Sequence, residues 1–235
     1  RGMLKKISGL FMELVQGQGG IRIMDPAGLK RIEAWCRGYD IKIMVDEIHT
    51  GMGRTGTRWC YEQYNLLPDG VTLGKALGGN AQDANALVIR EDLSFGEMGR
   101  ESSTYELPPV VATTVLSALD LLEIEKLPTK ANISGRILGS LLKKHFRGKP
   151  HIIDIRGLGL MWGVECRTSA FRDNLVDEAL KRGLLLSGVG FSEETPRELV
   201  CGPTVRFTPQ LNVTEEELEK AINIVAAAYE AAIAK

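Results

Sequence analysis

The stretch IKIMVDEIHTGMGRTG, residues 41–56, decides the fold together with DGVTLGKALGG at residues 69–79. In each stretch a short apolar run leads into a glycine-rich loop, which is typical of a buried strand that ends at the edge of a sheet. The first strand delivers Asp46 to its carboxyl end and the second delivers Lys75. Ligands of parallel sheets bind at the carboxyl ends of the strands, so these two side chains are the first candidates for chemistry.

The neighbouring sequence predicts more strands alternating with helices. Residues 7–15 have the character of a buried strand, and residues 85–90 of another. Between them, Asp25 is placed to cap a helix whose first turn begins at Pro26. Strands separated by helices in this way favour an α/β fold with a mainly parallel sheet.

The pattern becomes helical after Pro108 and changes again near Pro150. The later part predicts two short strands around a glycine turn, a helix, another strand and a closing amphipathic helix, at residues 151–166, 170–182, 204–209 and 218–229. We therefore expect a large domain over residues 1–149 and a small α+β domain over residues 150–235.

Composition excludes several classes of partner. The 235 residues are 44% hydrophobic and 25% charged, with a formal net charge of −1, which favours neither nucleic acid nor an anionic membrane. Apolar runs fall short of the roughly 20 residues that span a bilayer. Three separated histidines and four cysteines without a CxxC pair predict no metal site and fit a reduced, cytoplasmic setting.

The pair of Asp46 and Lys75 is more informative than either residue alone. An aspartate at a strand end is often only a loop cap, and an isolated lysine is often only a surface residue. A desolvated lysine, however, attacks carbonyl groups, and a carboxylate opposite it holds a protonated ring nitrogen. Pyridoxal phosphate enzymes use this combination.

These residues carry a family resemblance. The run DEIHTGMGRTG, residues 46–56, followed by PDGVTLGKALGG, residues 68–79, resembles the motif of the class III (omega) aminotransferases of pyridoxal phosphate fold type I. Lys75 follows Asp46 by 29 positions, the spacing of that family. The stretches VQGQGGIR, SSTYE and CGPTVRFTPQLNVTEEELEKAI also match, at residues 15–22, 102–106 and 201–222.

The resemblance implies roles for four cofactor-binding residues. Asp46 would pair with the pyridine nitrogen of pyridoxal 5′-phosphate, and Lys75 would form the Schiff base and move the substrate proton. His49 stands where the family usually has glutamine beside the phenolic oxygen. Thr104 would bind the cofactor phosphate of the neighbouring subunit, which implies a homodimer. Residues 1–149 would then be the later part of the cofactor-binding large domain.

Two further residues would bind substrate. Arg206 would hold a substrate carboxylate, and Gln18 replaces the family glutamate that often pairs with this arginine. Glu47, next to Asp46, is expected to have a structural role. The implied reaction moves an amino group, expected to be a terminal one, from an amine or amino acid to a keto acid.

The resemblance covers only the later half of the family. The loop that binds the cofactor phosphate and the aromatic residue that stacks on the ring belong to the other half, so we expect a C-terminal fragment that is inactive alone. Three alternatives stay open: a racemase, decarboxylase or lyase on the same fold, a catalytically silent partner subunit, and a nucleotide-binding α/β domain of another family.

Overall fold

The computed structural model describes residues 7–79, 81–94, 96–97, 108–191 and 202–234. The chain divides into two compact units. Unit 1 comprises Arg1–Leu14, Met24–Gly53 and Thr57–Leu127, and unit 2 comprises Val15–Ile23, Arg54–Gly56 and Pro128–Lys235. The assignment of residues 1–149 to a large domain and 150–235 to a small one stays a prediction.

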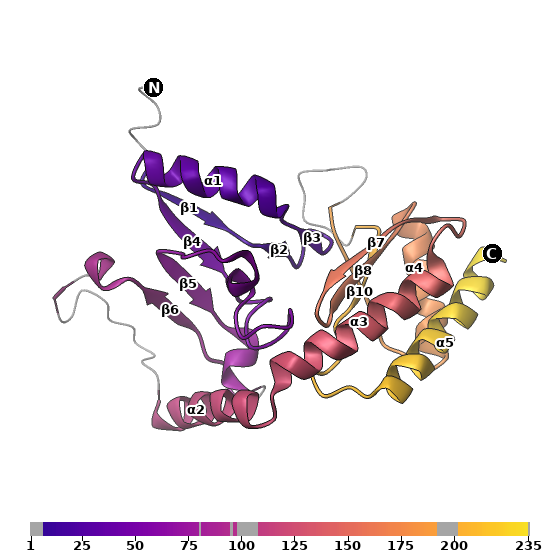
Figure 1. Ribbon diagram of the computed structural model, residues 1–235. Coiled ribbons are helices and arrows are strands. Elements are labelled where there is room, and N and C mark those ends of the chain that lie inside the picture. Colours follow the sequence, from indigo (N-terminus) through magenta and orange to yellow (C-terminus); the bar gives the residue numbers. More distant parts are fainter. Residues whose placement is uncertain (1–6, 80, 95, 98–107, 192–201, 235) are drawn as a thin grey trace. The chain divides into compact units, whose positions relative to one another are not determined.

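Unit 1 is built on a four-stranded sheet (Figure 1). Its strands lie in the order β1 (Gly9–Met12), β4 (Lys42–Asp46), β5 (Gly70–Leu73) and β6 (Ala86–Ile89). The pairs β1–β4 and β4–β5 are parallel, and β6 runs antiparallel to β5. The sheet is therefore mainly parallel, as expected, with one antiparallel edge strand.

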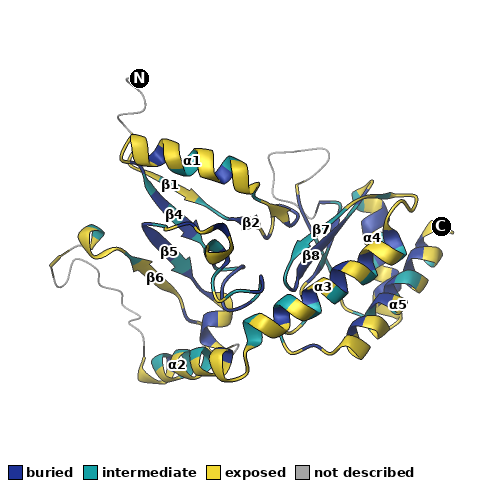
Figure 2. Cartoon of the chain, in the orientation of Figure 1, coloured by how far each residue is buried: buried dark blue, intermediate teal, exposed yellow. Residues whose placement is uncertain are grey.

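Within the described residues of unit 1, two α-helices and three 3-10 helices accompany this sheet. They are α1 (Pro26–Gly38), α2 (Pro109–Ile124), η2 (Cys60–Tyr64), η3 (Lys75–Gly78) and η4 (Glu91–Leu93). The start of α1 is as the sequence predicts, because the Asp25 carboxylate accepts the Gly28 N–H at 2.7 Å. Figure 2 shows that α2 is largely exposed, and its apolar residues Leu116 and Ile124 are among those exposed.

The first strand is not the continuous buried strand expected over residues 7–15. β1 ends at Met12, and Phe11 on it is 58% exposed. Val15 already belongs to β2 (Val15–Gln16) of unit 2, which pairs antiparallel with β3 (Arg22–Ile23). Residues beyond Met12 bond instead to the segment that returns after the glycine-rich turn, since the Met24 N–H donates to the Leu14 carbonyl at 2.9 Å and Val15 pairs with Ile23.

Unit 2 carries an antiparallel sheet with helices packed against it. The strands lie in the order β7 (Ile152–Leu158), β8 (Met161–Cys166), β10 (Thr204–Phe207) and β9 (Ser187–Val189). The helices are α3 (Leu127–Phe146), α4 (Ser169–Lys181) and α5 (Glu215–Ile233). The predicted hairpin, helix, strand and closing helix are all present, whereas β9 was not foreseen. The core includes the predicted stripe of α5, namely Leu218, Ile222, Val225 and Tyr229.

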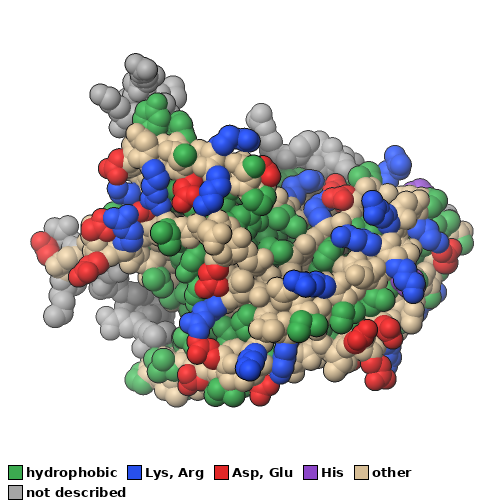
Figure 3. All heavy atoms as spheres, viewed as in Figure 1, with side chains coloured by type: hydrophobic (Ala, Val, Ile, Leu, Met, Phe, Trp, Pro, Cys, Tyr) green, Lys and Arg blue, Asp and Glu red, His purple; other side chains and the backbone are tan. Residues whose placement is uncertain are grey.

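Basic and acidic side chains are interspersed on the face of the molecule seen in Figure 3. Among the helices of the described ranges, none is long and apolar enough to cross a membrane.

One buried carboxylate connects four elements of unit 1. Asp69, at the start of β5, has a fully buried side chain that accepts the Ile43 N–H of β4 at 2.7 Å. It also accepts bonds from Arg37 of α1 at 2.6 Å and Arg90, just after β6, at 2.7 Å. Burial acts to raise the pKa of this carboxyl, but the Ile43 N–H and the two arginines outweigh it, so the net pKa lies below the ordinary value of 3.8.

We predict that Asp69→Asn lowers the free energy of unfolding by roughly 2–4 kcal/mol, since charged hydrogen bonds to a buried carboxylate are lost. A group whose folded-state pKa is depressed stabilises the fold above its unfolded pKa, and this contribution disappears as the pH falls through the folded value. Urea denaturation should therefore show the full difference at pH 7 and a shrinking one below pH 3.8. A difference that grows on acidification would contradict this account.

Candidate functional site

The first group of candidate residues lies at the carboxyl ends of the parallel strands in the unit 1 sheet. Asp46 is the last residue of β4, and Lys75 follows the end of β5 by two positions. Because β4 and β5 are adjacent and parallel, both residues emerge at the same edge. Asp46 is partly buried and accepts the Ile48 N–H at 2.9 Å through one carboxylate oxygen, while Lys75 is exposed.

The backbone at Lys75 is in an unusual conformation. Its φ is +45°, in the left-handed region that residues other than glycine rarely adopt. The preceding Gly74 lies close to Asn85, because a Cβ at residue 74 would lie 2.6 Å from the Asn85 Oδ1 atom and the Asn85 side chain would have to move. The turn is closed by the Leu77 N–H, which donates to the Gly74 carbonyl at 3.0 Å. Strain of this kind persists only where the surroundings impose it, and it is frequent at functional positions.

Thr72 is a residue of this edge that the sequence reasoning missed. It is the register partner of Asp46 across β4 and β5, so the two side chains leave the same face of the sheet. Its Oγ1 atom is buried and, within the described part of the chain, lacks a hydrogen-bond partner. A threonine three positions before the lysine is visible in the sequence, but its register opposite Asp46 is not.

His49 and Glu47 follow Asp46 in the chain but have different surroundings. His49 is partly buried, three residues beyond Asp46. Glu47 is almost fully buried, accepts the Thr50 hydroxyl at 2.6 Å and accepts the Tyr61 N–H at 2.9 Å. Burial raises the pKa of the Glu47 carboxyl above its usual range. Glu47 thus anchors the loop to the start of η2, in agreement with the expected structural role.

The second group lies in unit 2, on one face of its sheet. Arg206 of β10 stands in register with Gly163 of β8 and Ser187 of β9. Its Nε atom is buried and has no hydrogen-bond partner among the described residues. Desolvation lowers the pKa of the Arg206 guanidinium. A partly buried cation with an unused donor atom is suited to binding an anion.

Gln18 lies in the turn between β2 and β3, in the same unit. Its side chain is exposed, and its backbone carbonyl accepts the Gly190 N–H at 2.8 Å. The turn packs on the sheet face that carries Arg206, because a Cβ at Gly163 would lie 3.1 Å from the Ile21 Cβ atom. The structure therefore places Gln18 and Arg206 in one unit and Asp46, His49 and Lys75 in the other. Thr104 lies outside the described residues.

The glycine-rich loop after Asp46 has a structural function that the sequence did not reveal. Arg54 donates to the carbonyls of Leu160 and Pro209, at 3.1 and 2.5 Å, within unit 2. Burial lowers the pKa of its guanidinium to about 10. Gly159 must be glycine, since a Cβ there would lie 2.3 Å from the Thr55 carbonyl carbon. Arg54 and Thr55 of the motif therefore fix the loop backbone within unit 2.

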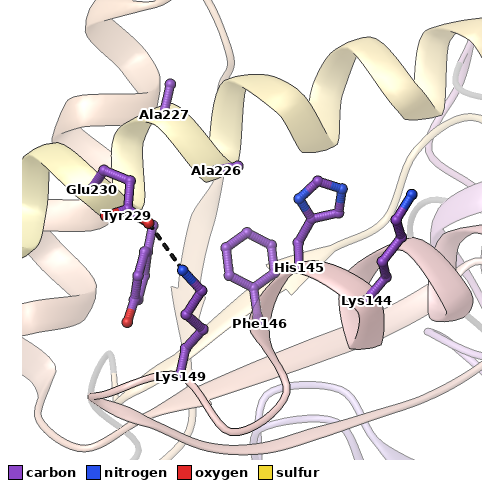
Figure 4. A pocket seen from close by; sticks show the side chains of 8 residues that line it. All are labelled: Lys144, His145, Phe146, Lys149, Ala226, Ala227, Tyr229 and Glu230. Atoms are coloured by element: carbon purple, nitrogen blue, oxygen red, sulfur yellow. Dashed lines mark hydrogen bonds and ion pairs between the residues drawn. The ribbon is translucent and has the colours of Figure 1, made fainter.

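Two hollows of unit 2 are potential binding sites. One, of about 450 Å³, is lined mainly by apolar residues of α3, α5 and the segment before β9, with Ser187 and Arg206 among its lining residues. The other, of about 410 Å³, lies between the end of α3 and α5 (Figure 4). Its Lys149 already pairs with Glu230 at 3.1 Å and lies over the Tyr229 ring. None of the candidate residues lines this second hollow.

Comparison with known proteins establishes the family. The profile of the class-III aminotransferases matches residues 2–229. The chain therefore belongs to the class-III aminotransferase family, as its motifs indicate. Similar solved aminotransferases confirm the fold class, a partial type I fold.

Several characterised relatives are similar over most of the chain. The acetylornithine aminotransferase of Haemophilus ducreyi is 33% identical, over 94% of this chain and 52% of the relative. The ornithine aminotransferase of Plasmodium chabaudi chabaudi is 31% identical, over 93% and 51%. The solved ornithine aminotransferase of Toxoplasma gondii, which has partial occupancy of PLP at its active site, is 30% identical with a TM-score of 0.88, over 99% and 53%. The chain thus spans about half the length of these relatives.

Proposed function

We propose that this chain takes part in pyridoxal phosphate-dependent transamination between an amine or amino acid and a keto acid. The observation that carries the proposal is the parallel pairing of β4 and β5, which brings a carboxylate and an amine to one sheet edge. Relatives named acetylornithine and ornithine aminotransferases support it. They also favour a donor that carries a terminal amino group.

The residues of unit 1 fit this cofactor. The Asp46 carboxylate accepts the Ile48 N–H through one oxygen, which leaves acceptor capacity for a protonated ring nitrogen. Lys75 presents an exposed amine from a strained turn. Among the described residues the buried Thr72 hydroxyl has no hydrogen-bond partner, and it offers one more polar group on the sheet face that carries Asp46. When bound, the cofactor supplies an electron sink for bonds at the substrate carbon.

Each residue would then have a distinct task. Asp46 would keep the ring nitrogen protonated, and Lys75 would bind the cofactor covalently and carry the substrate proton. His49 would donate a hydrogen bond to the cofactor. By its place in the sequence motif, Thr104 would bind the cofactor phosphate of a neighbouring subunit.

In unit 2, we propose that Arg206 binds a substrate carboxylate. Its buried Nε without a partner and the bidentate geometry of guanidinium support this role. Gln18 in the family's glutamate position contributes a neutral amide, which holds an arginine less firmly than a carboxylate does. Arg206 would accordingly be freer to engage an α-carboxylate.

We also propose a homodimer in the cytoplasm. Exposed apolar side chains on β6 and α2, such as Val88, Leu116 and Ile124, suit a protein–protein contact. The three cysteines in the described ranges form no disulfide, which suits a reducing compartment.

The cofactor-binding role of Lys75 predicts selective covalent labelling. The chain, combined with the segment that corresponds to the first half of its relatives, should be incubated with pyridoxal phosphate and reduced with borohydride. Peptide mass spectrometry should locate the label on Lys75, because its amine would bind the cofactor covalently. Lys75→Ala should remove this label and abolish amino transfer.

Lys126 offers a matched control in the same unit. It is also exposed and also has a positive φ, of +51°, but it lies after α2 and not at the sheet edge. Lys126→Ala should retain both label and activity. Equal labelling of the two lysines, or full activity of Lys75→Ala, would refute the assignment.

The role of Arg206 predicts substrate-dependent kinetics. Arg206→Ala should weaken binding of donors that carry a carboxylate by about 2–5 kcal/mol, since a charged contact is lost from a desolvated position. The Michaelis constant of simple amines should change far less. Arg136→Ala, an exposed arginine of α3, serves as the control and should leave both constants unchanged. The same increase for both classes of donor in Arg206→Ala would show that Arg206 does not bind the carboxylate.

A further inference from the structure

We propose that Arg156 of β7 is a positioning residue that fixes the turn bearing Gln18 over the sheet face bearing Arg206. The proposal rests on the function proposed for Gln18 and Arg206, and it assigns a specificity-setting role to a residue whose guanidinium nitrogens bind protein atoms. Its basis is the set of contacts that the Arg156 guanidinium makes within unit 2.

One edge of the guanidinium binds the backbone of the turn. Arg156 Nε donates to the carbonyls of Gly20 and Ile21, at 3.0 and 3.1 Å. Arg156 Nη2 donates to the Gly20 carbonyl at 2.5 Å and lies 3.4 Å from the Thr204 hydroxyl of β10. One side chain therefore connects two successive carbonyls of the turn to the strand that carries Arg206.

The other edge of the guanidinium is anchored to the sheet. Arg156 Nη1 pairs with Asp154 at 2.9 Å and with Glu165 at 2.5 Å. The Arg156 side chain is only 13% exposed. Each of its three nitrogens already has a partner, so Arg156 is a clamp of the protein backbone and is not available to a ligand.

The clamped turn is strained, which explains why a clamp is needed. Gly20 has a φ of +96°, and Ile21 has a φ of +55°. Positive φ at a β-branched residue is an outlier that persists only where the surroundings impose it. The Ile21 side chain is fully buried above Gly163, and the two carbonyl contacts with Arg156 fix the peptide groups of the turn.

The contacts of Arg156 also restrict the position of Gln18. Its carbonyl is held by the Gly190 N–H at 2.8 Å, and the next anchor along the chain is the Gly20 carbonyl on Arg156. Arg156, Gly163 and Arg206 lie next to one another on the adjacent strands β7, β8 and β10, because Gly163 is the register partner of both arginines. Arg156 therefore sets the distance at which the Gln18 turn lies from Arg206.

Hydrogen exchange tests the clamp directly. The assembled protein should be compared with three variants, Arg156→Gln, Arg156→Lys and Asp154→Asn, by amide exchange of peptides covering residues 15–23 and of peptides from α5. Lysine keeps the charge for Asp154 and Glu165 but cannot contact both carbonyls through one planar group. Exchange in residues 15–23 should rise at least tenfold in both Arg156 variants, with α5 unchanged. Asp154→Asn should retain the protection, since it leaves the carbonyl contacts in place.

Two results would overturn the proposal. Full protection in Arg156→Lys would show that charge alone holds the turn. A loss of protection in Asp154→Asn as large as in Arg156→Gln would show that the ion pair, and not the carbonyl contacts, holds it. If Arg156→Gln does not fold, the lysine and asparagine variants still decide the question.

Kinetics separate this proposal from the proposed function. Arg156→Lys should raise the Michaelis constant of carboxylate donors about tenfold and leave kcat within twofold, because the bond-breaking residues are untouched. A faster exchange of residues 15–23 with an unchanged Michaelis constant would uphold the clamp as a feature of the fold. It would overturn the specificity role of Arg156, whereas the proposed role of Arg206 is tested separately by the kinetics of Arg206→Ala.

Discussion

Unit 1 depends on the hydrogen bonds and ion pairs that the buried Asp69 carboxylate makes. Asp69 joins β4 through Ile43, α1 through Arg37 and the end of β6 through Arg90, and its own backbone N–H donates to the Ile43 carbonyl at 2.7 Å. These bonds fix β4 and β5 at their amino ends. The parallel register of β4 and β5 extends this alignment to their carboxyl ends, where Asp46 and Lys75 lie. A structural carboxylate at one end of the strands thus supports the candidate chemistry at the other.

Backbone strain marks both groups of candidate residues. Lys75 follows Gly74 with a φ of +45°, and Ile21 follows Gly20 with a φ of +55°. In each case a glycine precedes a residue that would normally avoid this conformation. A Cβ at Gly74 would displace the Asn85 side chain, and a Cβ at Gly20 would approach the Thr204 hydroxyl to 3.1 Å. The glycines of the motifs therefore serve close packing as much as flexibility.

Local patterns in the sequence predicted much of this structure. The cap at Asp25, the hairpin of β7 and β8 and the apolar stripe of α5 each depend on residues close in the chain, and each is present. The placement of Asp46 and Lys75 at strand ends followed from apolar runs and glycine-rich loops.

Long-range contacts were not predictable in the same way. The exposure of Phe11, the antiparallel direction of β6 and the register of Thr72 opposite Asp46 depend on pairing between distant segments. The clamp of Arg156 on Gly20 joins residues 136 positions apart. Periodicity carries no signal for such a contact. The roles of Gln18 and Arg206 came from family resemblance, and their shared unit came from the structure.

The most direct test of the central claim is a crystal structure of the chain, assembled with the segment that completes the family's length, in the presence of pyridoxal phosphate. We expect electron density that is continuous from the cofactor to Lys75 Nζ, with the ring nitrogen within hydrogen-bond distance of the Asp46 carboxylate. Cofactor bound at full occupancy elsewhere, with Asp46 and Lys75 not touching it, would contradict the account.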